Sequence, residues 1–310
     1  MIYLDGSRFF FDIEGEFSGL CHSVREKNAG LPGNEEAKEL IAGFARFFGT
    51  KPENVRVGEN YEALLSVLLT GKKTVITETD ESAEHYAAAF PGGSAFRMPK
   101  PADLKIRPAV LGNFLDENEA GALLFTNPCC PGGLLMAPDE VETLLSSTPA
   151  RIVVDESHMV GEENSVLKLT EKYKNLVVLK RMRFGGNGVF AVGQNLPNVL
   201  CGLSAADQAA GAVIFERNSA LKTALRKLTD SRDSLYIRIK KLAIKYASVE
   251  RLYRTKADHV FFKVTDAEER AKRLSEKGIQ VRCTDGGLCI FAGDKAENEA
   301  VLTTLEDVLS

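Results

Sequence analysis

The chain has 310 residues, of which 44% are hydrophobic and 26% are charged, which is the composition of an ordinary soluble globular protein. A chain of this length can form one large core and a smaller lobe. The net charge of −4 argues against nucleic-acid binding, and the sequence has no run of the roughly 18 apolar residues that a membrane-spanning helix needs.

The N-terminal sequence and the cysteines indicate the cellular compartment of the protein. Met1 to Asp5 lacks the charged and apolar regions of a signal peptide. The six cysteines are scattered, with one adjacent pair, and form neither a disulfide framework nor a C-x-x-C metal pattern. These features predict a cytoplasmic protein with free thiols.

Residues 1–30 are predicted to form an N-terminal arm. Ile2 to Ile13 alternates weakly between apolar and polar residues, and Phe9 to Phe11 is apolar enough to need cover. We therefore expect a short strand or arm that packs against another part of the protein. A helix should follow, with Asn34 as its N-cap and Phe48 near its end, because Gly49 stops the pattern.

Residues 31–220 are predicted to form a large α/β domain. After a helix over 62–69, a strand over 74–77 and a helix over 81–90, strands and helices alternate to about Ala191, which is typical of a βαβ sheet. Three buried apolar strands deliver polar loops, namely those at 122–125, 151–155 and 175–179. Because ligands bind at the carboxyl ends of strands in such sheets, these loops mark the candidate site.

Residues 221–254 are predicted to form a linking helix, because apolar residues recur at helical spacing between lysines and arginines. The cationic residues are interpreted as a solvated face. Residues 255–310 are predicted to form a small α+β domain, with strands at 259–264, 280–283 and 288–292 and helices at 267–277 and 298–309.

The order of several segments resembles the fold-type I pyridoxal-phosphate enzymes, in particular the histidinol-phosphate aminotransferase and threonine-phosphate decarboxylase branch. The segments are KPENVRVG at 51–58, TNPCCPG at 126–132 for the family's N-P-x-N-P-T-G, VDESH at 154–158 for V-D-E-A-Y, NLVVL at 175–179, ADHV at 257–260 and GIQVR at 278–282. The resemblance implies a mostly parallel, seven-stranded-type sheet with a small C-terminal α+β lobe. It also implies pyridoxal 5'-phosphate as cofactor, an amino acid or amino-acid phosphate as substrate, and a homodimer.

The resemblance assigns roles to individual residues. Asp155 occupies the position of the carboxylate that keeps the pyridine nitrogen protonated, and Asn127 matches the first asparagine of its motif. Cys130 and His158 stand where the family has the two hydrogen-bond donors to the ring oxygen. Arg282 matches the arginine of G-I-x-V-R on the substrate side.

The Schiff-base lysine is where the sequence departs from the family. An ungapped alignment of residues 175–179 places Phe184 at the lysine position, 29 residues after Asp155. Lys180 lies four residues earlier and could act as the catalytic lysine only if the loop were re-routed. Arg183, with Arg181 and the glycine-rich turn that follows, could hold an anion.

Other positions also lack the residues with which the family binds its cofactor and substrate. Ala83 replaces the aromatic ring that stacks on the pyridine, Leu31 the tyrosine that reaches the partner subunit, and Cys289 the arginine that binds the substrate carboxylate. Loss of one donor from a preorganised site costs about 2 to 4 kcal/mol, so several losses together weaken a cofactor site severely.

Three functions therefore stay open. The first is an active pyridoxal-phosphate aminotransferase or decarboxylase that uses Lys180. The second is a catalytically inactive homologue, without cofactor, that acts as a dimeric binding or regulatory module. The third is an anion site or a thiol site built from Cys129 and Cys130 near His158. If Phe184 fills the lysine position, Asp155 should pair with a local cation or hydrogen-bond donor.

Overall fold

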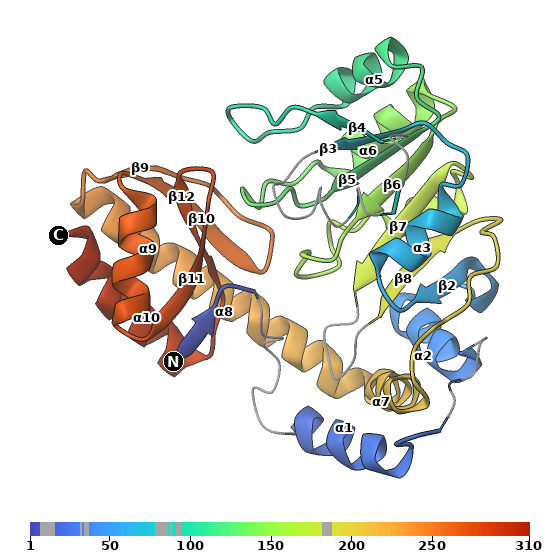
Figure 1. Ribbon diagram of the computed structural model, residues 1–310, viewed down its shortest axis with the longest axis horizontal. Helices are drawn as coiled ribbons and strands as arrows, with labels where there is room; N and C mark the ends of the chain where they lie inside the picture. The colour runs from blue at the N-terminus through green and yellow to red at the C-terminus, as the bar shows by residue number, and fades with distance from the viewer. Residues whose placement is uncertain are drawn as a thin grey trace.

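The computed structural model describes residues 1–6, 16–31, 33, 37–77, 86, 89–90, 95–181 and 188–310. In these residues two lobes, each built on its own sheet, are joined by a long helix (Figure 1). Several sequence predictions concern residues outside this set: Phe9 to Phe11, Asn34, Ala83, Arg183 and Phe184.

The large lobe contains a seven-stranded sheet in the order β2-β8-β7-β6-β5-β3-β4. The strands, in this order, are Val55–Gly58, Val189–Gly193, Leu176–Arg181, Arg151–Asp155, Ala122–Thr126, Thr74–Thr77 and Ala95–Met98. Strand β8 runs antiparallel to both of its neighbours, and the other pairs are parallel. The predicted fold class, a mostly parallel seven-stranded sheet with a small α+β lobe, is confirmed.

Helices cover both faces of this sheet, which explains why its central strands are continuous apolar runs. On one face, here called the α2 face, pack α1 (Glu16–Lys27), α2 (Lys38–Phe48), α5 (Pro108–Glu117), α6 (Pro138–Ser147) and α7 (Ala205–Glu216). On the other, the α3 face, packs α3 (Tyr61–Leu68) together with Tyr86 and Phe90. Short 3-10 helices, η1 (Pro52–Asn54) and η2 (Leu167–Glu171), lie between these elements.

Two N-terminal details differ from expectation. Helix α2 begins at Lys38, four residues after the predicted cap. Helix α1 lies within the predicted arm and was not expected. Its apolar pattern is short, and among its described side chains Phe17 and Cys21 are buried. It packs along α7, as Figure 1 shows.

The small lobe contains a five-stranded sheet in the order β1-β11-β12-β10-β9. Its strands are Ile2–Leu4, Ile279–Thr284, Gly287–Phe291, His259–Val264 and Val249–Leu252, with α9 (Ala267–Glu276) and α10 (Lys295–Leu309) packed on it. Strand β1 pairs in parallel with β11, so the first residues of the chain complete the C-terminal sheet. The prediction of an N-terminal strand that packs on another part of the protein is confirmed for Ile2–Leu4.

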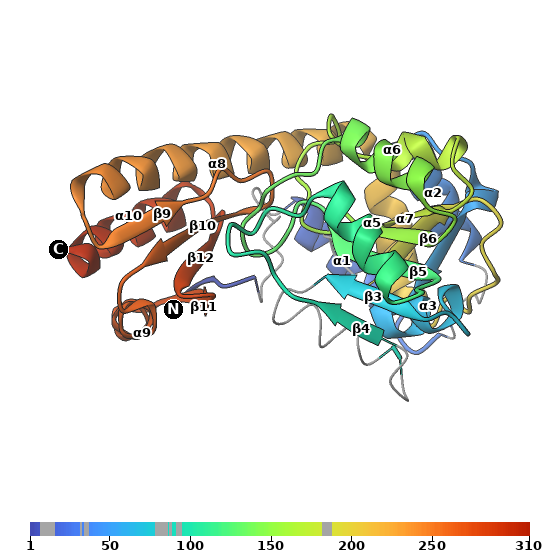
Figure 2. The ribbon, with the colours of Figure 1, turned by 90° about the horizontal axis from the view of Figure 1, so that it is seen from above.

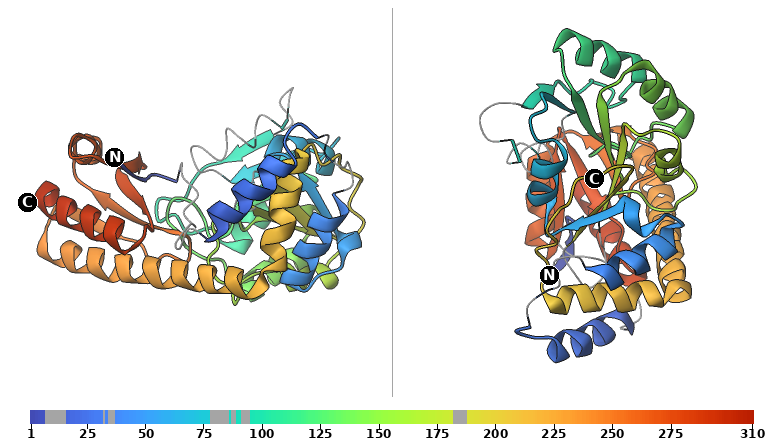
Figure 3. Two further views of the ribbon diagram at one scale, coloured as in Figure 1. Left: turned by 90° about the horizontal axis from the view of Figure 1, so that it is seen from below. Right: turned by 90° about the vertical axis from the view of Figure 1, so that its right-hand side faces the viewer.

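Helix α8, Asn218–Lys245, runs along both lobes (Figures 2 and 3). Leu221 and Leu228 near its start belong to the large core, whereas Leu235 and Ile239 belong to the small one. The prediction that this helix reaches Arg254 is wrong. Residues 249–252 instead form β9, because they find a pairing partner at the edge of β10. Among the described residues, none of the helices is long and apolar enough to cross a membrane.

Candidate active site

Asp155 lies at the carboxyl end of β6, buried at the predicted rim with 3% of its surface exposed. One carboxylate oxygen, Oδ1, accepts a hydrogen bond from the backbone N–H of Ser157 at 2.8 Å, and Oδ2 accepts one from the phenol of Tyr86. Tyr61 donates to the hydroxyl of Ser157 at 2.5 Å, and its ring meets that of Tyr86 edge-on at 5.4 Å between centroids. Asp155 therefore has the local hydrogen-bond donor that its burial predicted.

The phenol groups of both tyrosines remain protonated and can donate hydrogen bonds. Burial, together with the nearby carboxylate of Asp155, raises the pKa of Tyr86 and of Tyr61 well above the ordinary phenol value. Both hydroxyls therefore keep their protons at neutral pH. Sequence reasoning did not identify either residue as a partner of Asp155, because nothing local to a tyrosine shows that its hydroxyl reaches a carboxylate distant in the sequence.

Lys180 lies on β7, next to β6, but its side chain does not join this cluster. In the register of the two strands Asp155 is paired with Leu179, and side chains alternate between the faces of a sheet. Leu179 packs on the α3 face, whereas Lys180 Nζ lies 4.9 Å from the centroid of the Phe48 ring on the α2 face. The structure thus places Asp155 and Lys180 on opposite faces of the sheet.

On the α2 face Lys180 is held by two carboxylates. Its Nζ is 3.0 Å from Glu156 Oε2 and 2.6 Å from Glu162 Oε2. The Glu156 side chain is fully buried and also accepts hydrogen bonds from the Ser165 hydroxyl, at 2.6 Å, and the Val166 N–H, at 2.7 Å. Burial alone would lower the pKa of Lys180, but the two carboxylates outweigh it and raise the pKa. The amine is therefore held protonated.

The space around Lys180 is also small. The cavity that it lines, together with Phe44, Phe48 and Glu156, has a volume of about 50 Å³. Pockets that bind small molecules usually measure roughly 300 to 1,000 Å³. A cavity of this size holds little more than a water molecule, so the cavity that Lys180 lines among the described residues is too small for a pyridoxal ring.

Asn127 and the two cysteines lie in the loop after β5. The side chain of Asn127 makes two hydrogen bonds with the backbone of Met136, at 2.8 and 3.0 Å, so it fixes the turn. Cys130 is 7% exposed, and its N–H donates to Thr126 Oγ1 at 3.4 Å. Burial raises the pKa of Cys129 to about 11, and its thiol donates to the Leu104 carbonyl.

His158 faces the small lobe. Its Nδ1 lies 3.1 Å from Asp258 Oδ1, and the same oxygen is 3.0 Å from Nδ1 of the fully buried His259. Burial lowers the pKa of His259, against the opposing effect of Asp258. Arg282 lies on β11 with its guanidinium 5.2 Å from the centroid of the Phe291 ring. These residues gather where the two lobes meet.

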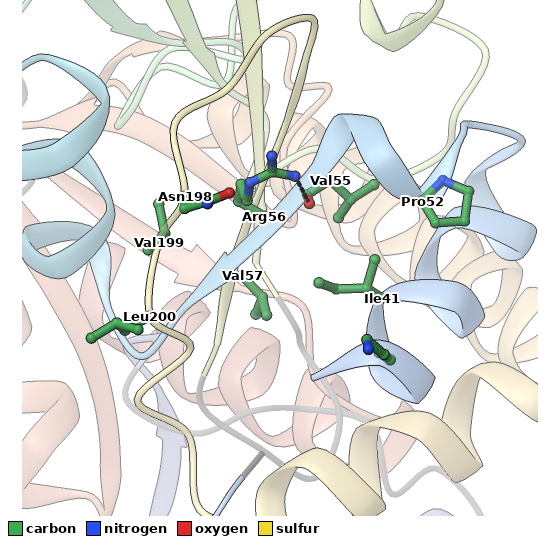
Figure 4. Close-up of a pocket in the computed structure, with 9 residues that line it drawn as sticks. Ile41, Pro52, Val55, Arg56, Val57, Asn198, Val199 and Leu200 are labelled. Atoms are coloured by element: carbon green, nitrogen blue, oxygen red, sulfur yellow. Dashed lines mark hydrogen bonds between the residues drawn. The ribbon is translucent and has the colours of Figure 1, made fainter. Parts of the chain in front are cut away.

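A cavity of about 520 Å³ lies elsewhere, against the edge strand β2 (Figure 4). Arg56 and Lys38 are the charged residues that line it. The guanidinium of Arg56 donates to four backbone carbonyls, those of Glu53, Val55, Leu196 and Pro197. Arg56 therefore ties the chain after β8 to the sheet edge, and its hydrogen-bonding nitrogens are occupied by protein.

The sheet order, the single antiparallel strand and the small C-terminal lobe define the fold of the type I pyridoxal-phosphate-dependent transferases. Histidinol-phosphate aminotransferase from Clostridium acetobutylicum superposes with a TM-score of 0.83 at 14% identity, over 99% of both chains. The enzyme from Sinorhizobium meliloti, solved in complex with pyridoxal-5'-phosphate, gives a TM-score of 0.81 at 16% identity, over 99% of this chain and 90% of the other.

The sequence comparisons agree with the fold. The model of aminotransferase class I and II matches residues 22–181, and the chain belongs to this family. Histidinol-phosphate aminotransferase from Clostridium kluyveri is 22% identical over 99% of this chain and 93% of its own length. The chain is therefore a distant homologue of the histidinol-phosphate aminotransferases.

Proposed function

We propose that this protein is a non-transaminating member of the class I and II aminotransferase family, which keeps the fold as a binding module and does not form a lysine imine. The observation that supports the proposal is the position of Lys180. Its amine is paired with Glu156 and Glu162 on the α2 face, across the sheet from Asp155. A lysine attacks a carbonyl only as the neutral amine, so the two carboxylates oppose the reaction.

The cofactor itself makes two demands on the protein, a carboxylate at the ring nitrogen and a lysine for its aldehyde. Asp155 fits the first by position, but its Oδ2 already accepts a hydrogen bond from Tyr86. Lys180 does not fit the second. The residues that the structure describes therefore do not fit a covalently held pyridoxal phosphate.

An amino acid or an amino-acid phosphate is the ligand class that we propose, because enzymes of this family act on such compounds. We further propose that the protein is a cytoplasmic homodimer. The family resemblance supports the dimer, because Leu31 stands where the family has a residue that reaches the partner subunit, and Leu31 is 54% exposed in the single chain. Light scattering at micromolar concentration should give twice the chain mass of 33.8 kDa, and the monomer mass would contradict the dimer.

The proposal is tested by adding pyridoxal phosphate to the purified protein. A lysine imine absorbs visible light, and borohydride converts it into a stable pyridoxyl-lysine that peptide mass mapping can locate. We expect neither a visible band nor a modified lysine in the folded protein. Lys180→Met and, as a matched control for surface labelling, Lys172→Met should give the same result as the unmodified chain.

The opposite outcome is equally clear. A visible band that disappears in Lys180→Met but persists in Lys172→Met, together with transaminase activity, would overturn the proposal in favour of an active enzyme. A stoichiometric pyridoxyl adduct at any other lysine would overturn it as well.

A further inference from the structure

The contact between the lobes brings together three side chains that carry metal-binding atoms. His158 follows β6 in the large lobe, whereas Asp258 and His259 stand at the start of β10 in the small lobe. Their candidate ligand atoms all lie within 4.8 Å of one another. None of them takes part in the cluster around Asp155.

The backbone holds these side chains in place. The N–H of Asp258 donates to the carbonyl of His158 at 3.0 Å, and Met159 pairs with Ala257 in an isolated antiparallel bridge. Two crossing segments are thus fixed to each other immediately beside the three side chains. A site held in this way loses little conformational entropy when an ion binds.

Both ring nitrogens of His259 face oxygen atoms of the protein. Its Nε2 lies 2.8 Å from the carbonyl oxygen of Pro131, which can only accept, so Nε2 carries the hydrogen. Its Nδ1 lies 3.0 Å from Asp258 Oδ1, which as a carboxylate oxygen also can only accept. A lone pair on Nδ1 facing a carboxylate in a buried site is repulsive, so a positive species, either a second ring proton or a metal ion, lies between Nδ1 and the carboxylate.

The arrangement has the features of a zinc site. The other ring nitrogen of a metal-bound histidine typically donates to a backbone carbonyl, as Nε2 of His259 does to Pro131. Asp258 Oδ1 is 3.1 Å from His158 Nδ1 and 3.0 Å from His259 Nδ1. Ligands on bonds of about 2.0 to 2.2 Å around a tetrahedral ion lie about 3.3 to 3.5 Å apart. The two oxygen–nitrogen pairs are therefore close to bonding separation, and all three ligand atoms lie within 4.8 Å of one another.

We propose that His158 Nδ1, Asp258 and His259 Nδ1 bind a divalent transition-metal ion, with zinc as the best match, that bridges the two lobes. Imidazole nitrogen and carboxylate oxygen are the donors that zinc accepts. The His158 side chain is 24% exposed, whereas Asp258 is 8% exposed and His259 is buried. The fourth position therefore opens on the His158 side, where water or a ligand group can complete the coordination.

The test uses the full chain without an affinity tag, stripped with chelator and assayed without pyridoxal phosphate, so that its result is separate from the proposed function. Zinc chloride titrated by calorimetry should bind at one ion per chain and raise Tm by several degrees. Cobalt in its place should give visible d–d absorption typical of a low-coordinate site. Asp258→Asn should weaken zinc binding by more than the roughly 10- to 100-fold that loss of an outer hydrogen-bond partner costs.

Control variants separate this site from other donors. His22→Ala removes an exposed histidine on α1, and Cys283→Ser removes an exposed thiol, and both should bind zinc as the unmodified chain does. If Asp258→Asn does not fold, His158→Gln serves in its place, because the His158 side chain is partly exposed, at 24%. Equal zinc affinity in the unmodified chain and in the folded site variant would overturn the proposal. The absence of zinc binding by the unmodified chain would also overturn it, and an NMR spectrum of His259 protonated on both nitrogens would then identify the proton that takes the place of the ion.

Discussion

At the ends of β6 and β7, the two faces of the sheet stabilise adjacent buried carboxylates with different kinds of partner. On the α3 face Asp155 is satisfied by neutral donors, the phenol of Tyr86 and a backbone N–H. On the α2 face Glu156 is satisfied by a cation, Lys180. One step along a strand moves a side chain to the other face, so two adjacent carboxylates meet different chemistry. Motif spacing alone therefore does not tell which carboxylate a nearby lysine serves.

The largest effect is expected from breaking the ion pair on the α2 face. Lys180→Met leaves Glu156 buried without its cation, which should cost about 3 to 5 kcal/mol in the free energy of unfolding, as measured by urea denaturation. Adding Glu156→Gln removes the orphaned charge and should recover part of the loss. Lys172→Met is the surface control and should leave the midpoint almost unchanged. A loss below about 1 kcal/mol in Lys180→Met would mean that the pair is not formed.

A smaller effect is expected on the α3 face. Tyr86→Phe removes the phenol that donates to Asp155, which should cost about 1 to 3 kcal/mol because a buried carboxylate oxygen loses its partner. Tyr61→Phe removes a bond to the neutral hydroxyl of Ser157 and should cost about 0.5 to 1.5 kcal/mol. Urea denaturation of the two variants side by side checks the order. Equal costs would argue against the Tyr86 contact.

The same tyrosines should make stability depend on alkaline pH. The pKa of each is raised in the folded state, mainly by burial and then by the charge of Asp155. Their contribution is fully present below the ordinary phenol value of about 10, and it is lost as the pH rises from there through the folded value. The slope should reach about 1.4 kcal/mol per pH unit for each tyrosine. Denaturant titrations between pH 9 and about 11 should show this slope, and Tyr86→Phe should reduce it.

The smallest effect concerns the thiols of the loop after β5. Cys129 is buried and its pKa is raised to about 11, so little thiolate is present near neutral pH. Cys283 is exposed. Alkylation followed by mass spectrometry should label Cys283 first and Cys129 only on unfolding. Early labelling of Cys129 in the folded protein would instead support a thiol-based site at this rim.

Much of the fold could be predicted because it depends on local patterns. The apolar runs that became β6 and β7 are long enough to identify, and glycines mark the ends of α2 and α9. Strand β9 could not be predicted, since residues 249–252 continue a helical pattern and become a strand only through pairing with β10. The order of the motifs indicated the family, but it did not predict the conformation of the individual loops.

The sequence predicts where the candidate site lies, but not which side chains contact one another there. A carboxylate at the end of a buried strand placed Asp155 correctly at the rim. The face on which Lys180 lies depends on the register between β6 and β7, which the sequence does not state. Likewise, Tyr61 and Tyr86 gather near Asp155 only because α3 and Tyr86 itself pack on the same face of the sheet. Such convergence of distant segments is a property of the folded chain.

Helix α8 makes the two lobes mechanically inseparable. Its 28 residues form a rod of about 42 Å, one half of which belongs to the core of the large lobe and the other half to that of the small lobe. A chain cut between the lobes would leave each fragment without part of the helix that closes its core, and strand β1 ties the first residues to the last sheet. The two lobes should therefore melt in one cooperative step, and neither should fold when expressed alone.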